Sequence, residues 1–290
     1  MRKILDFFTG WIQQVDLVLL ALCTGTTLFG CLMIASATRY TGSYKNVIVQ
    51  IAALGLGIVA YILMSMLDLN EIGKHWKWLL GGSLVLILLL KTPLGMDGGT
   101  GNRAWLGLKN FPVNLQPVEI VKITFIIVLA RQLQYLQEQR DLKSIPSVGM
   151  LAGHLVLVVG LYAAISGDMG SALVLIFIFA CMCFVAGVAK RWFVLGLLGG
   201  GFAFYVLWET DKINPYMKDR FLTLFDHNMD PLGIGWQQTR SLLALGGGKL
   251  TGQGLFNGTQ TQSASAWSLP ARHTDFIFSV IGEELGLLGC

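Results

Sequence analysis

The chain has 290 residues, of which 54% are hydrophobic and only 13% are charged. Soluble domains carry about 25% charged residues, so this composition excludes an ordinary soluble protein. The formal net charge is +4 at pH 7, and the basic residues are scattered rather than gathered in one patch, so nucleic acid is not a predicted partner.

Apolar runs of roughly 20 residues, the length of a membrane-spanning helix, recur along the chain. They predict an all-α polytopic membrane protein with about seven complete transmembrane helices and the start of an eighth. One domain is predicted over residues 1–290, with a large extracytoplasmic loop over residues 209–274. The predicted spans are Val15–Ala35, Asn46–Met66, Trp76–Leu90, Val118–Tyr135, Val148–Ile165, Met169–Gly187 and Trp192–Trp208, and the eighth begins near Asp275.

The first run is longer than the apolar core of a signal peptide, so it is predicted to be a retained span. Lys and Arg in short loops then set the orientation, because cytoplasmic loops carry an excess of both. That bias favours a cytoplasmic N-terminus. Three polar segments are thereby predicted to share the outer face, where ATP is not available: Thr92–Gln116, Ser166–Asp168 and Glu209–Thr274.

The first polar segment contains the string GNRAWLGL over residues 101–108. Arg103 stands beside Trp105, and two readings remain open. The pair could anchor the chain at the membrane interface, where Trp is common. Alternatively, the guanidinium could bind phosphate.

The string LQPVEIVK follows over residues 115–122, and its Pro117 predicts the start of a helix. Glu119 and Lys122 are three residues apart, so they share one helix face. A charge within a span normally faces the bundle interior or a water-filled cavity. The two residues could form a structural ion pair, or Lys122 could contact an anionic substrate.

The second polar segment reads SGDMGSA, and its Asp168 stands where a span begins. An acidic residue there can accept hydrogen bonds from free N–H groups of the helix and complements the helix dipole. Capping is therefore the predicted role of Asp168.

The third segment is the long loop, whose core reads DPLGIGWQQTRSLLALGGGKLTGQGLFNGTQ over residues 230–260. Trp236–Leu245 has helical spacing and predicts a helix at the membrane surface. The run GGGKLTGQG is not a Walker motif, because Lys249 is followed by Leu250 rather than Ser or Thr. Its glycines predict tight turns and a close backbone approach to a ligand.

The last segment reads RHTDFIF from residue 272, and GEELG follows from residue 282. Thr274 is a predicted N-cap of the eighth span, which would put Asp275 in the first helical turn. Gly282 and Gly286 have the GxxxG spacing of a helix-packing motif. Glu283 is predicted to lie well into the membrane, where it needs a partner or water.

These strings together resemble the shape, elongation, division and sporulation family of RodA, FtsW and SpoVE. The similarity extends from about Asp16 to the last residue, with the four motifs in the family's order: GNRAWLGL with NLQPVEIVK, GDMGSALV, DPLGIGWQQTRSLLALGGGKLTGQGL and LPARHTDFIFSVIGEELGLLG. The family has ten spans, so the chain is expected to be incomplete at its C-terminus. Ala271 is a departure, since the family usually has Glu there.

The resemblance implies an inverting glycosyltransferase that polymerises lipid II into peptidoglycan in a bacterial cytoplasmic membrane, together with a class B penicillin-binding protein. Asp275 would be the catalytic base, and Arg103 and Lys122 would offset charge on the departing pyrophosphate. The full set expected to bind substrate is Arg103, Trp105, Gln116, Glu119, Lys122, Asp168, Arg220, Gln238, Lys249, His273, Thr274 and Glu283; Arg240 is a weaker candidate.

No metal site and no certain cofactor are predicted, and the sequence leaves open whether a divalent cation, Mg²⁺ or Mn²⁺, takes part. Two rival functions also stay open. The first is a flippase for lipid-linked precursors, in which Lys122 and Glu283 would line a transport path. The second is a non-catalytic scaffold for the penicillin-binding protein.

Overall fold

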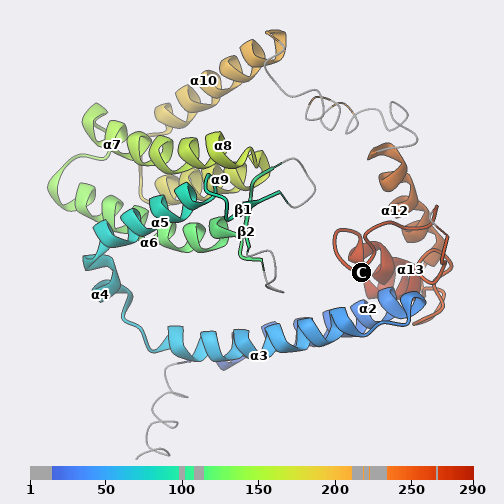
Figure 1. Ribbon diagram of the computed structural model, residues 1–290. Coiled ribbons are helices and arrows are strands. Elements are labelled where there is room, and N and C mark those ends of the chain that lie inside the picture. Colours follow the sequence, from blue (N-terminus) through green and yellow to red (C-terminus); the bar gives the residue numbers. More distant parts are fainter. Residues whose placement is uncertain are drawn as a thin grey trace, which may run out of the picture. The chain divides into compact units, whose positions relative to one another are not determined.

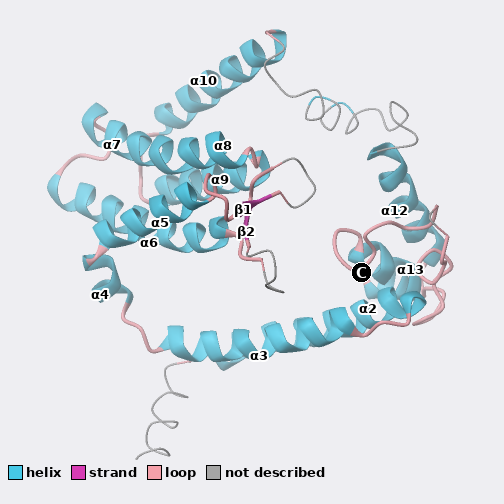
Figure 2. Ribbon diagram, in the orientation of Figure 1, coloured by secondary structure: helices cyan, strands magenta, loops and turns pink. Residues whose placement is uncertain are grey.

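The computed structural model describes residues 15–97, 102–107, 114–210, 218, 222, 234–265 and 267–290. Helices dominate these residues, as Figure 2 shows. Their contacts group the chain into two compact units, Met1–Leu67 with Thr210–Cys290, and Asp68–Glu209. One domain over residues 1–290 stays a prediction, because helices packed in one membrane can form more than one such unit.

The Asp68–Glu209 unit is a helical bundle with one short hairpin (Figure 1). The hairpin pairs β1 (Gly95–Met96) with β2 (Trp105–Leu106) in antiparallel fashion, and Met96 faces Trp105. The helices are α4 (Leu69–Lys74), α5 (Trp76–Leu89), α6 (Pro117–Gln139), α7 (Ile145–Leu155), α8 (Leu161–Ser166), α9 (Met169–Val185) and α10 (Lys190–Glu209), with a π-helical turn over Val156–Gly160 between α7 and α8.

Helix α6 supplies much of the apolar core of this unit. Val118, Val121, Phe125 and Leu129 recur every three to four residues, which places them on one helix face, and all four are buried. They pack in one cluster with Tyr162 of α8 and with side chains of α5 and α9. The core of this unit is therefore built almost entirely from apolar side chains.

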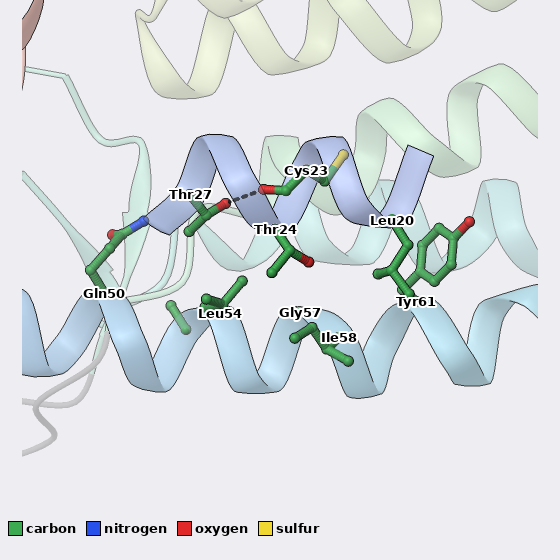
Figure 3. A pocket seen from close by; sticks show the side chains of 10 residues that line it. Leu20, Cys23, Thr24, Thr27, Gln50, Leu54, Gly57, Ile58 and Tyr61 are labelled. Atoms are coloured by element: carbon green, nitrogen blue, oxygen red, sulfur yellow. Dashed lines mark hydrogen bonds between the residues drawn. The ribbon is translucent and has the colours of Figure 1, made fainter. Parts of the chain in front are cut away.

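The other unit contains α2 (Leu17–Thr38), a 3-10 turn (Arg39–Thr41), α3 (Lys45–Ser65), α12 (Ile234–Gly248) and α13 (Ile277–Gly289). Helices α2 and α3 form a hairpin and are largely exposed and apolar, as membrane-facing helices are. A groove of about 290 Å³ runs between them, and small and polar side chains such as Thr24, Thr27 and Gly57 line it (Figure 3).

Helix α13 packs closely against α12 and the loop that follows α12. A side chain at Gly248 would collide with the carbonyl oxygen of Gly282, and one at Gly286 with the backbone nitrogen of Gly252. Gly282 packs against the Leu245 side chain of α12, as a helix-packing glycine does, whereas Gly286 has a non-helical φ of 72° and packs on the loop backbone instead. Gly252 and Gly254 of GGGKLTGQG have positive φ, as the predicted tight turns require, and Gly248 and Gly252 approach the backbone of α13 closely. Their approach to a ligand stays a prediction.

The predicted all-α membrane architecture is confirmed. Among the residues that the structure describes, four helical segments are long and apolar enough to cross a membrane: Leu17–Thr41, Lys45–Ser65, Ile145–Ser166 and Lys190–Glu209. Two shorter apolar helices, Trp76–Leu89 and Met169–Val185, coincide with further predicted spans. The helix predicted over Trp236–Leu245 is also present, as α12. The total number of spans stays a prediction.

Candidate functional site

Asp275 lies in a tight turn before α13 rather than in the first turn of the helix. The helix begins at Ile277, and Thr274 does not cap it. The hydroxyl of Thr274 instead donates to the carbonyl of Ala271 at 3.2 Å, and that carbonyl also accepts the backbone N–H of Phe276 at 3.2 Å. The capping prediction for Thr274 is wrong, because the helix begins at Ile277 and Phe276 takes the N-cap position, so Thr274 lies in the turn before it. The side chain of Asp275 is exposed.

Ala271, at the centre of this turn, has a positive φ of 39°. A residue with a Cβ is strained in such a conformation, and strain of this kind costs on the order of 1–3 kcal/mol. The surrounding contacts must therefore hold the turn in place: Thr274 and Phe276 close it on the carbonyl of Ala271, and Arg272 ties its start to the preceding loop.

Arg272 is buried and donates hydrogen bonds to several carbonyls of the loop. Its Nε donates to the carbonyl of Leu269 at 3.1 Å, and its Nη1 donates to the carbonyls of Thr261 and Ser263. Its Nη2 donates to Oγ of Ser268 at 2.8 Å. The guanidinium also lies over the Tyr40 ring, 3.9 Å from its centroid. Burial lowers the pKa of Arg272, but arginine stays protonated because its ordinary value is so high.

Glu283 has a carboxylate that is fully surrounded, with an exposed fraction of 1%. Its Oε1 accepts the N–H of Gln260 at 2.7 Å. Its Oε2 accepts the N–H of Thr261 at 2.8 Å and the Thr261 hydroxyl at 2.7 Å. The predicted need for a partner is thus met by the loop. Its substrate-binding role stays a prediction.

Glu284 is a buried carboxylate that the sequence did not single out. It accepts the hydroxyl of Ser36 from α2 at 2.6 Å, the amide of Gln262 at 3.1 Å and the N–H of Phe256 at 3.1 Å. The signal that could have found it is the pair of adjacent acids inside an apolar helix. Charges are so costly there that each needs donors of its own.

The other predicted residues of this unit lie at its surface or outside the described residues. Lys249 is exposed and has a positive φ of 52°. His273 is half-buried and borders a polar cavity of about 220 Å³ that Tyr40 and Arg272 also line. Oε1 of Gln238 is buried without a hydrogen-bond partner among the described residues. Arg220 falls outside the described residues.

Asp168, in the Asp68–Glu209 unit, caps α9 as predicted. Its Oδ1 accepts the N–H of Ser171 at 3.2 Å, and its Oδ2 accepts the hydroxyls of Ser171 at 2.7 Å and Tyr162 at 3.0 Å. Burial acts to raise the pKa of the Asp168 carboxyl, but the hydrogen bonds outweigh it, and the net pKa lies below its ordinary value. The carboxylate therefore stays charged near neutral pH.

Glu119 and Lys122 form the predicted ion pair on α6. Nζ of Lys122 lies 2.7 Å from Oε2 of Glu119, and 57% of the Glu119 side chain is exposed. Gln116 precedes the helix at the N-cap position but makes no capping hydrogen bond with its side chain. Arg103 is exposed, and Trp105 is half-buried in β2.

Within the described ranges, no group of three or more His, Cys, Asp or Glu is placed to hold a metal ion. Whether a divalent cation takes part is not decided by this observation. The geometry of the 253–276 loop brings together Arg272, Thr261, Glu283 and Glu284, with Asp275 on the turn that ends it. Of the charged groups in this set, only Asp275 is exposed, and an accessible carboxylate is a candidate general base.

Residues 14–290 match the model of the FtsW/RodA/SpoVE family, described as cell cycle proteins. A probable peptidoglycan glycosyltransferase FtsW from Geobacter metallireducens is 34% identical, and the match covers 96% of this chain and 73% of the relative. A protein of the same name from Trichlorobacter lovleyi is also 34% identical, with coverage of 96% and 72%.

Two solved structures share the fold. One belongs to a peptidoglycan synthase complex described as coordinating polymerization and crosslinking, with a TM-score of 0.70, 26% identity, and coverage of 93% of this chain and 71% of that one. The other is the rod shape determining protein RodA of Thermus thermophilus, with a TM-score of 0.60, 26% identity, and coverage of 94% and 67%. The chain is therefore a multi-pass membrane protein that belongs to the FtsW/RodA/SpoVE family of cell cycle proteins.

Proposed function

We propose that this chain is a peptidoglycan glycosyltransferase that polymerises lipid II into glycan strands. The observation that carries the proposal is its 34% identity, over 96% of its length, to relatives named as such glycosyltransferases. The exposed carboxylate of Asp275, on a turn that directly follows the buried hydrogen bonds of Arg272, supports the same reading, because a general base must reach its substrate.

The proposed step is a single displacement at the anomeric carbon of the donor sugar. A hydroxyl oxygen of the acceptor sugar attacks this carbon while its proton passes to the carboxylate of Asp275. The bond from the anomeric carbon to the pyrophosphate oxygen breaks, and the lipid pyrophosphate leaves with the electron pair. One base and one displacement give inversion of configuration.

The departing pyrophosphate gains negative charge, so cations aimed at it lower the barrier. Arg103 and Lys122 are the residues that we expect to serve there. Both are accessible, because Arg103 is exposed and 24% of the Lys122 side chain is exposed. Trp105, Gln116 and Asp168 are expected to shape the surroundings of these cations.

The proposed partner is a class B penicillin-binding protein in a bacterial cytoplasmic membrane. It is supported by the structural similarity to a chain of a complex that coordinates polymerization and crosslinking. A polymerase that makes new strands needs a crosslinking enzyme beside it, which gives the association a chemical reason.

Purified protein, given lipid II with and without the penicillin-binding protein, tests the function. Glycan strands that form with the parent protein support the polymerase. Transfer of lipid II across vesicles without strand synthesis would identify a flippase instead. If the protein shows neither activity, the scaffold function is the one that remains.

The outer location of the 209–274 segment is a separate proposal, supported by the Lys and Arg bias of the short loops. A cysteine introduced at exposed Lys249 should react with a membrane-impermeant thiol reagent in intact cells. One introduced at exposed Arg140 should react only after the membrane is opened. The reverse labelling would contradict the proposed orientation.

A further inference from the structure

The loop from Gln253 to Phe276 is held from two sides by buried charges of opposite sign. On one side, Glu283 and Glu284 accept backbone N–H groups of the first half of the loop, from Phe256, Gln260 and Thr261. On the other side, Arg272 donates to the carbonyls of Thr261, Ser263 and Leu269, which ties the first half of the loop to the second. Hydrogen bonds to charged groups are about twice as strong as neutral ones, so this arrangement holds the loop firmly.

Thr261 is the residue where the two sides meet. Its N–H and its hydroxyl both donate to Oε2 of Glu283, and its carbonyl accepts Nη1 of Arg272. The side chain is fully buried. Thr261 therefore couples the carboxylate on α13 to the guanidinium that begins the RHTD string.

The path from Arg272 to Asp275 is short. Arg272 immediately follows Ala271, whose carbonyl collects the hydroxyl of Thr274 and the N–H of Phe276. Asp275 stands between those two donors, so its backbone has little freedom once Arg272 is clamped. A further tie runs from Glu284 to Ser36 of α2, which secures the same loop to a membrane helix.

We propose that Glu283, Glu284 and Arg272 are positioning residues that fix the turn carrying Asp275. Glu283 and Arg272 act through Thr261, and Glu284 acts through the neighbouring loop residues Phe256 and Gln262. The inference rests on the proposed function, and for Glu283 it replaces the predicted direct contact with substrate by an indirect role, because loop donors occupy both oxygens of its carboxylate. It explains why two adjacent carboxylates lie buried in α13, since a misplacement of about 1 Å at a reacting group can cost about 10²-fold in rate.

The test compares Thr261→Val with Thr261→Ser. Valine keeps the shape and both backbone contacts but lacks the hydroxyl that Glu283 accepts, whereas serine keeps all three contacts. Thr38→Val is the matched control, because Thr38 is also buried and its hydroxyl bonds to Ile34 of its own helix at 2.8 Å.

We expect Thr261→Val to lower kcat for strand synthesis by about 10-fold or more, with KM for lipid II unchanged, because the base is displaced while the substrate contacts remain. Thr261→Ser should restore kcat, and Thr38→Val should leave it at the parent value. All rates are measured at a temperature at which each variant is folded, so a purely structural role would not lower kcat.

Amide hydrogen exchange over residues 256–262 gives a readout that is independent of activity. Exchange should accelerate in Thr261→Val and not in Thr261→Ser. An unchanged kcat in Thr261→Val, or an equal loss in Thr38→Val, would overturn the positioning proposal. A parent protein that makes no strands would overturn the proposed function and the positioning role with it, while exchange would still report whether the carboxylates hold the loop.

Discussion

Helices α13 and α6 place their charged side chains in opposite environments: those of α13 are buried, and those of α6 are accessible to solvent. On α13, Glu283 and Glu284 are buried at 1% and 0% exposure, and loop donors saturate them. On α6, the apolar face is buried, whereas Glu119 and Lys122 lie at the accessible start of the helix. A buried apolar stripe tolerates many sequences, but a buried carboxylate requires donors at fixed places. The α13 region therefore has a more narrowly specified loop geometry than α6.

Asp275, which precedes the buried pair by eight residues in the sequence, is itself exposed. It is exposed while Glu283 and Glu284 are enclosed, which is the arrangement expected if the buried acids hold the loop and the exposed one reacts. The predictions below test this division between reactive and structural charges, from the largest expected effect to the smallest.

Replacing Asp275 should give the largest loss of activity. Asp275→Asn is expected to lower strand synthesis by about 10²–10⁴-fold, the usual contribution of a general base, with little change in thermal stability because the side chain is exposed. Asp275→Glu should rescue poorly, since it moves the carboxylate by a methylene. Near-parent synthesis by Asp275→Asn would show that the exposed acid is not the base.

Lys122→Met should separate chemistry from stability on α6. If Lys122 offsets charge on pyrophosphate, the rate should fall by about 10²–10³-fold, as when a charge-stabilising donor is removed. The free energy of unfolding should change by less than about 1 kcal/mol, because the Glu119 side chain is 57% exposed and exposed ion pairs contribute little to stability. An active Lys122→Met protein would rule out this role.

Glu284→Ala should be far more damaging to stability than Glu119→Ala. It leaves the Ser36 hydroxyl and the Phe256 N–H buried without their acceptor. Removing one partner of a buried charged network costs about 3–5 kcal/mol, whereas Glu119→Ala should cost less than about 1 kcal/mol. Thermal unfolding in detergent measures both. Equal losses of stability in the two variants would contradict the proposed difference between α13 and α6.

Asp168→Asn should have the smallest effect on stability, because Asn can also cap α9. We expect the free energy of unfolding to fall by about 1 kcal/mol or less at neutral pH. The pKa of Asp168 is depressed in the folded protein, so the charged carboxylate contributes stability above its ordinary value of 3.8. That contribution is lost as the pH falls through the folded pKa. Unfolding curves of the parent and Asp168→Asn should therefore converge in acid.

Local patterns were enough to predict several parts of the site. The start of α6 at Pro117, the Glu119–Lys122 pair and the Asp168 cap depend on residues within four positions of one another. Thr274 failed as a cap although its local pattern was favourable, because a turn closed by the N–H of Phe276 on the carbonyl of Ala271 delays the helix start to Ile277, and the pattern does not reveal this turn.

The sequence by itself determined the membrane-spanning helices, since their length and hydropathy follow from local composition, and the motif order that marks the family. Only the tertiary structure decided where the charges of α13 go. Ser36 and Glu284 are 248 positions apart, and their contact depends on how α2, the 253–276 loop and α13 pack together. Because the rest of the fold must place both partners of such a hydrogen bond, no local sequence pattern predicts it.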